Sequence, residues 1–367
     1  MEYGSSDIQL IMMDATINSM LEKCKKLYAV YQVDLFQLLE KIMLGPVIRI
    51  IIRYLLINPK GKLRLTETKA LVENCPLMLG MLSTSELHKS NDWYGHASVL
   101  KKYANISQSD SIKSTIEHGV FFDNFVWDQD TQSRFPSIIT FSKDHTKFLS
   151  RLTKKKIYTI GPLIHYAQSF LDATSQKNER ARLGKTLLVF PAHSTSMCDV
   201  NYDMKKFCKK ILLLGKGYSS IRICLYWKDI LGGWDKKYRS FGFECVTAGH
   251  IFDPLFLPRL KSIIDLSDNT ISNIPGTHSG YCIYMNKPHQ ILSQSMNYYG
   301  DRIDSQRSNK TLSNKTYLEL CETFSKPTNL ITKEQYNLIN TYWGLDQIKT
   351  KEELGKIIHE AEASYKK

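Results

Sequence analysis

The sequence lacks the short signatures of several large enzyme classes. No Gly-x-Gly-x-x-Gly follows an expected strand, no Walker A sequence occurs, and no Gly-x-Ser-x-Gly nucleophile elbow is present. These absences argue against nicotinamide-dependent dehydrogenases, P-loop enzymes and α/β-hydrolases. The chain also has no arginine-rich tract, zinc-finger spacing or RNA-binding signature. We therefore expect no nucleic-acid partner.

Further absences restrict the location and the cofactors that we expect. The eight cysteines include no Cys-x-x-Cys pair, which favours reduced, buried thiols in a cytoplasmic protein. No apolar run approaches about 18 residues, and the N-terminus MEYGSSD has no signal-peptide features, so we expect neither a transmembrane helix nor secretion. No two histidines have the His-x-His or His-x-x-x-His spacing of a zinc site, so we expect no metal and no other cofactor.

What the sequence does contain is an excess of positive charge on a chain long enough for two domains. Its 367 residues suit two α/β domains of roughly 150 to 180 residues each. A formal charge of +13 favours partners that carry phosphate groups or anionic lipid.

The segment 47–65, VIRIIIRYLLINPKGKLRL, follows a stretch of helical periodicity over residues 7–44. Arg49 and Arg53 lie one helical turn apart on an otherwise apolar helix that ends at Pro59. Two interpretations fit: a helix that docks on the anionic inner face of the membrane, or a buried helix that exposes one charged stripe.

From residue 70 onward, short apolar strands alternate with helical patterns. We expect strands within 70–82, 111–119, 135–142, 155–162, 186–190, 220–226, 243–248 and 269–272. Helices are expected from 91, from 143, and over 163–171, 204–214 and 255–266, and the chain is helical from 315. The polar segment 172–185 is interpreted as an interdomain linker. The pattern predicts two doubly wound parallel domains, residues 1–172 and 185–367, with the last helix crossing back onto the first domain.

One strand-to-helix turn, within NTISNIPGTHSGYCIYMNKP at 269–288, is a candidate phosphate site. Glycine and hydroxyl side chains there surround an expected helix N-terminus, where N–H groups and the helix dipole favour an anion. An ordinary turn in which Ser and Thr merely cap the helix is the alternative. The candidate binding residues are Ser272, Asn273, Gly276, Thr277, His278 and Ser279.

Histidines recur where expected strands end, which is where functional residues gather in open α/β sheets. They are His118, His193, His250 and His278, with His165 a weaker fifth. An imidazole with a near-neutral pKa suits a general base, which makes His118 a candidate. Glu117 could orient it or be the base itself, but strand alternation should point the two side chains to opposite faces.

Two other polar motifs are of types that can bind a phosphate group or a nucleotide. His193 follows Pro191 and Ala192 and precedes Ser194, so it could donate to the phosphate of a leaving group, with Ser194 beside it. The sequence 128–130 is formally Asp-x-Asp, a metal–nucleotide signature of single-Rossmann glycosyltransferases. It does not end a clear strand, and we reject it as such a site.

The sequence resembles bacterial surface-polysaccharide glycosyltransferases of the GT-B fold. The features that carry this resemblance are two Rossmann-like halves, the His118-Gly119 turn, the Pro-x-His turn at 191–193 and the late serine- and threonine-rich turn. The broader group includes Kdo- and sialic-acid-type transferases and the CDP-glycerol glycerophosphotransferases of wall teichoic acid synthesis. NDWYGHASVLKKYA, IEHG, ITFS and IGPLIHYA also look like capsule and O-antigen transferases. The resemblance covers roughly residues 90–292.

The resemblance implies a GT-B-like fold: two Rossmann-like domains that face a central cleft, with additional N- and C-terminal helices. His118 would be the catalytic base, and His193 would contact the donor phosphate, although the families usually have His-Pro where this chain has His-Ser. Ser272, Thr277 and Ser279 would hold the phosphate, in place of the families' Asp-Tyr-Ser-Ser.

The implied activity is inverting, metal-independent transfer of a sugar from a nucleotide-activated donor to a growing surface glycan or a lipid-linked acceptor. A cytidine nucleotide is favoured because the resembling families use one. The enzyme would be cytoplasmic, with peripheral contact to the inner membrane face. Two alternatives remain: transfer of an alditol phosphate at the same site, and a non-catalytic nucleotide-binding assembly protein.

Overall fold

The computed structural model describes residues 64–73, 86–122, 125–195 and 197–366. All of them fall in one of the two compact units into which the chain divides. The helices expected over 7–44, most of the candidate membrane segment 47–65 and most of the strand expected within 70–82 lie outside the described residues. Residues 70–73 are helical, within α4 (Thr68–Glu73), so that part of the predicted strand is wrong.

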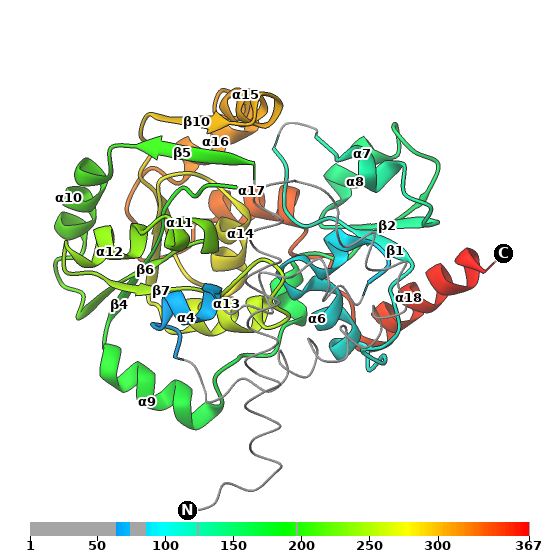
Figure 1. Ribbon diagram of the computed structural model, residues 1–367, viewed down its shortest axis with the longest axis horizontal. Coiled ribbons are helices and arrows are strands. Elements are labelled where there is room, and N and C mark those ends of the chain that lie inside the picture. Colours follow the sequence, from blue (N-terminus) through cyan, green and yellow to red (C-terminus); the bar gives the residue numbers. More distant parts are fainter. Residues whose placement is uncertain (1–63, 74–85, 123–124, 196, 367) are drawn as a thin grey trace, which may run out of the picture. The chain divides into compact units, whose positions relative to one another are not determined.

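A parallel three-stranded sheet, of order β1-β2-β3, forms the first half of the described chain (Figure 1). Ile116, Ile138 and Ile139 are buried in it, which explains why these short β-branched runs fold as strands. The three predicted strands are confirmed. Their bounds are β1 (Ser114–Ile116), β2 (Ser137–Thr140) and β3 (Lys156–Thr159).

The second half contains a parallel five-stranded sheet of order β7-β6-β4-β8-β9. Its central strand β4 is buried along its whole length, which matches the uninterrupted apolar sequence TLLVF. The four predicted strands are confirmed, and β9 is additional. The bounds are β4 (Thr186–Phe190), β6 (Ser220–Cys224), β7 (Glu244–Val246), β8 (Asn269–Ser272) and β9 (His289–Ile291).

Helices alternate with these strands, as the pattern predicts. Before β1 lie η1 (Lys89–Gly95) and α6 (His96–Tyr103), and α8 (Lys143–Leu149) follows β2. Ser142 caps α8 by accepting from the His145 N–H, which confirms the predicted helix start. In the second half, α10 (Met204–Leu214), α13 (Phe256–Asp265) and α14 (Thr277–Tyr284) also agree with expectation. The protein is therefore an α/β protein built on parallel sheets.

The polar segment interpreted as a linker is a helix, α9 (Ala173–Leu183), which begins at the N-cap Asp172. Its sequence shows no apolar stripe because only Leu183 is buried. Charged contacts hold it instead: Arg180 donates to the Leu266 carbonyl oxygen over 2.7 Å and pairs with Asp268. Within the described residues, no strand pairing joins the three-stranded sheet to the five-stranded sheet on the other side of this helix.

Several elements differ from the prediction. The helix expected over 163–171 is only a short 3-10 turn, η2 (Leu163–Tyr166). It ends there because the backbone of Phe170 and Leu171 donates to the Pro258 carbonyl and the Ser262 hydroxyl of α13. Short elements that the sequence analysis missed are α7 (Asp128–Thr131), β5 (Cys198–Tyr202), α11 (Trp227–Leu231), α12 (Trp234–Arg239), β10 (Met296–Gly300) and α15 (Arg302–Thr311).

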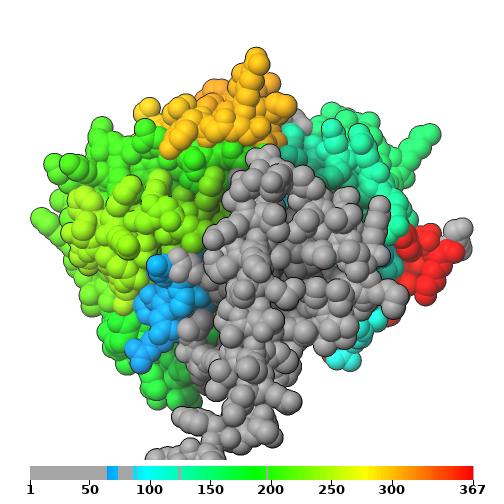
Figure 2. Space-filling view, viewed as in Figure 1, coloured from blue at the N-terminus to red at the C-terminus, as the bar shows by residue number. Residues whose placement is uncertain are grey.

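Strands β5 and β10 form an antiparallel ribbon that precedes α15. Helix α15 buries none of its residues, and this part of the chain, in orange, stands out at the surface in Figure 2. Its polar sequence has no apolar periodicity for the analysis to detect.

The chain ends in three helices, α16 (Lys315–Thr323), α17 (Lys333–Trp343) and α18 (Lys351–Tyr365). The last returns to the first sheet, as expected: Glu360 accepts from Lys156 over 2.7 Å and from Tyr158 over 2.9 Å, both on β3 (Figure 1). Among the described residues, no helix is long and apolar enough to cross a membrane.

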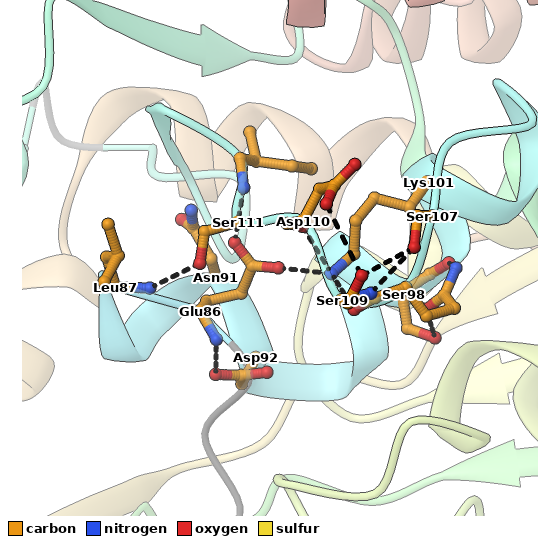
Figure 3. A network of polar contacts seen from close by, with 12 residues as sticks. Glu86, Leu87, Asn91, Asp92, Ser98, Lys101, Ser107, Ser109, Asp110 and Ser111 are labelled. Carbon is orange, nitrogen blue, oxygen red and sulfur yellow. Dashed lines mark hydrogen bonds and ion pairs between the residues drawn. The ribbon is translucent and has the colours of Figure 1, made fainter. Parts of the chain in front are cut away.

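A buried ion pair fixes the segment that leads into β1 (Figure 3). Lys101 on α6 donates to Glu86 over 2.6 Å and to the carbonyl oxygens of Gln108 and Asp110 over 3.0 Å each. The second carboxylate oxygen of Glu86 accepts from the Ile112 N–H. Apart from the contact within the pair, these hydrogen bonds go to backbone groups of the loop between α6 and β1.

Asn91 protects the free edge of β1. Its side-chain oxygen accepts from the Ile116 N–H and its amide donates to the Ser114 carbonyl oxygen, each over 2.8 Å. The Asn91 side chain thus replaces a neighbouring strand, which both satisfies and blocks the edge. The end of β1, from which Glu117 and His118 extend, is fixed in position by this contact.

We expect Lys101→Met to destabilise the protein strongly, because Glu86 would keep a buried negative charge without its partner. Removing one member of such a pair costs about 3 to 5 kcal/mol. The free energy of unfolding in urea measures this. Lys102→Met, the exposed neighbour on the same helix, is the matched control and should unfold almost as wild type. Equal stability of the two variants would contradict the structural role of the pair.

Candidate functional site

A cavity of about 180 Å³ lies at the carboxyl ends of β1 and β4 and at the start of α14. It brings together five of the residues singled out in the sequence, from both halves of the chain. They are His118, His193, Gly276, Thr277 and His278. The cavity also contains residues that the sequence analysis did not select, among them Tyr94, His96, Tyr226 and Tyr281.

The first turn of α14 supplies hydrogen-bond donors to this cavity. The N–H groups of Thr277 and His278 have no carbonyl acceptor within the helix because they precede its first complete turn. The Thr277 hydroxyl accepts from the Val120 N–H over 3.2 Å, so its own proton is available to donate. A Cβ at Gly276 would lie 2.8 Å from the His278 ring, so glycine makes room for that imidazole.

Three other residues of the predicted phosphate turn are buried behind it and do not line the cavity. The Ser272 hydroxyl donates to the Ile274 carbonyl oxygen over 2.6 Å, and the hydroxyls of Ser272 and Ser279 contact His289 Nε2 at 3.0 and 3.3 Å. The Asn273 side-chain oxygen accepts from the Ala192 N–H. These side chains shape the turn, and of the residues expected to bind phosphate there, only Gly276, Thr277 and His278 line the cavity.

His118 sits in an aromatic enclosure formed by Trp93, Phe121 and Trp127, with ring centroids at 4.5, 5.7 and 6.1 Å. Burial, followed by the positive charge of Arg307, lowers the pKa of His118 to about 3. Its Nδ1 is buried without a partner among the described residues. The imidazole is therefore neutral at physiological pH and has an unused nitrogen.

His193 has a defined tautomer. Its Nδ1 lies 2.7 Å from the Ser194 carbonyl oxygen, which can only accept, so Nδ1 carries a proton and Nε2 remains for a ligand. The ring packs against Tyr226 at 4.4 Å. Ser194 is buried and does not line the cavity. Its N–H donates to Asp229, and its hydroxyl accepts from the Val200 N–H.

His278 and His96 complete a group of four imidazoles around the cavity. His278 stacks on Phe190 at 4.8 Å, and burial followed by the nearby His289 and His193 holds its pKa well below the ordinary value. Burial, together with His118, lowers the pKa of His96 to about 3. His278 Nε2 and His96 Nδ1 are both buried without a partner among the described residues.

The remaining strand-end histidines have structural roles. His250 packs on Trp227 at 4.4 Å, and His165 contacts the Tyr284 hydroxyl at 2.5 Å. Neither lines the cavity. His96 was missed because it begins α6 just after Gly95, whose φ is +70°, and no sequence pattern marks that junction.

Glu117 faces away from His118, as strand alternation predicts. It accepts hydrogen bonds from the Thr140 hydroxyl and from His145 Nε2, and it lines a different cavity. In the rejected Asp-x-Asp motif, Asp130 is buried whereas Asp128 is exposed. Within the described ranges, no group of three or more His, Cys, Asp or Glu side chains is arranged to hold a metal ion.

Comparison of the chain with models of known protein families and with curated proteins finds no match.

Trp343 of α17 holds the start of α14 in place. Its indole N–H donates to the Thr277 carbonyl oxygen over 3.1 Å, and the ring lies directly against Gly280. A Cβ at position 280 would overlap that ring. Gly280 therefore permits the contact that connects α17 to the cavity wall.

We expect Gly280→Ala to destabilise the protein by about 1 to 3 kcal/mol, the usual cost of overpacking a core. Gly355→Ala in α18 is the matched control, because among the described residues a Cβ there would have only the Ala104 carbonyl oxygen as a neighbour, at 4.0 Å. It should instead stabilise by about 0.5 to 1 kcal/mol through helix propensity. Thermal and urea unfolding compare them, and an unchanged Gly280→Ala would refute the close contact.

Proposed function

We propose that the protein is an inverting, metal-independent glycosyltransferase that moves a sugar from a nucleotide-activated donor to a glycan or lipid-linked acceptor. One observation carries the proposal: His118 from the first half and the start of α14 from the second half line the same cavity. A general base and an anion-binding helix N-terminus are the two groups that this reaction requires.

Unsatisfied imidazoles support a ligand in this cavity. Nitrogens of His96, His118 and His278 are buried and have no partner within the described part of the chain. Native proteins seldom leave buried polar atoms unpaired, so such atoms point to a bound ligand or water. Three of them around one cavity favour a polar ligand that accepts or donates several hydrogen bonds.

The start of α14 suits the donor phosphate. Free N–H groups, the Thr277 hydroxyl and the helix dipole all favour an anion there. His193 lines the same cavity, and because its Nδ1 is held by the Ser194 carbonyl oxygen, Nε2 is the ring nitrogen left to contact a leaving phosphate. We favour a cytidine nucleotide because the resembling transferases use one.

His118 is suited to remove the proton from the acceptor hydroxyl. Its ring is neutral at physiological pH, so it can accept a proton, although a pKa of about 3 makes the free imidazole a weak base. An anionic donor beside it would raise that pKa and strengthen the base as the reaction complex assembles. The proton removed from the acceptor would then rest on His118 while the phosphate leaves toward α14.

The cavity is too small to hold a whole nucleotide sugar, which is relevant to the proposed GT-B arrangement of two domains around a cleft. About 180 Å³ is less than the roughly 300 to 1,000 Å³ of ordinary ligand sites. It accommodates a sugar ring or a phosphate group rather than a whole nucleotide sugar. We propose that the two halves act as Rossmann-like domains that separate to admit the donor, and that the Thr277–Val120 contact re-forms on closure.

We expect His118→Ala to lower turnover by about 100- to 10,000-fold, the contribution of a positioned base. Nucleotide affinity should change little, because the phosphate lies against α14. The exposed His359→Ala should be fully active. In the wild type, kcat/KM should stay flat down to about pH 5, because the free base keeps its lone pair until the pH nears its lowered pKa. Wild-type turnover by a folded His118→Ala protein would exclude His118, and Glu117 would be tested next.

The two hydroxyls of the α14 turn should behave differently toward nucleotides. Thr277→Ala removes a donor that faces the cavity and should weaken nucleotide binding by about 1.5 to 3 kcal/mol, the contribution of a hydrogen bond to a charged group. Ser279→Ala removes an internal contact with His289 and should lower stability while leaving affinity nearly unchanged. Calorimetric titration of both variants provides the comparison. A larger affinity loss in Ser279→Ala would place the phosphate elsewhere.

A further inference from the structure

A second and larger cavity, of about 450 Å³, lies on the other side of the segment 117–120. Gly119 and Val120 line it, and the Val120 N–H also contacts Thr277 of the first cavity. This segment therefore borders both spaces, with His118 lining the first cavity and Glu117 lining the second. Its volume is within the roughly 300 to 1,000 Å³ typical of ligand pockets.

One wall of the second cavity contains a carboxylate whose two oxygens both accept hydrogen bonds from neighbouring side chains. Glu117 is 1% exposed and accepts from His145 Nε2 over 2.9 Å and from the Thr140 hydroxyl. Burial alone would lower the pKa of His145, but the hydrogen bond and charge of Glu117 outweigh it and raise that pKa. The other ring nitrogen of His145 has no hydrogen-bond partner in the ranges that the structure describes, so it is available to form a hydrogen bond with a ligand.

The rim of this cavity is cationic. Lys147 and Arg151 contribute from α8 and the turn after it, and Lys315 from the start of α16, against the single acid Asp144. None of the three cations forms an ion pair with another described residue. Charges that already neutralise one another are typical of a structural cluster, whereas unpaired cations around a cavity suit an anionic ligand.

The walls add an apolar surface. Phe121, Phe122, Phe148 and Tyr342 contribute aromatic rings to the same space. A cavity with aromatic walls, a few convergent polar groups and a basic rim suits a ligand that has both an apolar ring face and an anionic group. A saccharide unit that carries a carboxylate or a phosphate has this combination.

We propose that the second cavity binds an anionic saccharide unit of the acceptor, with Lys147 and Arg151 as its cationic contacts and His145 as a hydrogen-bonding contact. The assignment to the acceptor rests on the proposed transferase function, because Glu117 is adjacent in sequence to His118, the proposed base. An acceptor held by its anionic unit in the second cavity would have a neighbouring hydroxyl close to His118. Binding itself requires no donor and can be measured alone.

Calorimetry on the full chain tests this with three probes: trigalacturonate, glucose 1-phosphate and the neutral maltotriose. At least one anionic probe should bind, and maltotriose should bind about 10-fold more weakly or not at all. In the double variant Lys147→Gln/Arg151→Gln, affinity for that probe should fall about 10-fold or more, as expected when charge-assisted hydrogen bonds are lost. Which probe binds tells whether the anionic group is a carboxylate or a phosphate.

Lys143→Gln/Lys154→Gln removes the same charge from exposed positions of the same region that do not line the cavity, and it should bind the probe as wild type does. Equal losses in both double variants, or no binding of either anionic probe, would overturn the proposal. Nucleotide titrations on the same proteins report separately on the proposed function. If the wild type binds a nucleotide but neither anionic probe, the proposal for the second cavity is wrong and the proposed function stands. If it binds a probe but no nucleotide, the proposed transferase function is wrong.

Discussion

The contact between the Val120 N–H and the Thr277 hydroxyl joins the two halves of the described chain at the point where chemistry is proposed. On one side it fixes the turn that follows His118, and on the other it fixes the first residue of α14. Gly119 allows the approach, since a Cβ there would lie 3.3 Å from the Thr277 hydroxyl. Trp343 completes the arrangement by donating to the Thr277 carbonyl oxygen. This contact therefore holds the proposed base next to the proposed anion site.

Charge and burial are used differently in the two cavities. The first is small and lined by imidazoles, and burial lowers the pKa values of His96, His118 and His278, which suits proton transfer and hydrogen bonding. The second is larger and has at its rim cations that form no ion pair with another described residue, which suits the binding of an anion. Alternation along the end of β1 produces this division, because Glu117 and His118 face opposite sides.

Much of the fold followed from the sequence because its signals are local. Strands such as β4 and β8 are short apolar runs, and Ser142 caps α8 with its own side chain. Helix α9 and strand β5 were missed because long-range contacts, rather than an apolar stripe, stabilise them. Likewise, the sequence indicated the α14 turn as a site but could not tell which hydroxyls face outward. That depends on His289, seventeen residues after Ser272, which takes the Ser272 and Ser279 hydroxyls as its partners.

The central claim is that the start of α14 receives the phosphate of a nucleotide donor. Thermal unfolding in the presence of CMP, CDP, UDP, GDP and their sugars tests it most directly, because a ligand at 100 times its Kd adds about 2.7 kcal/mol to the free energy of unfolding. The account predicts that one nucleotide class, with cytidine favoured, raises the melting temperature of the wild type and raises it less in Thr277→Ala. Stabilisation by none of these ligands at millimolar concentration, or equal stabilisation of both proteins, would contradict it.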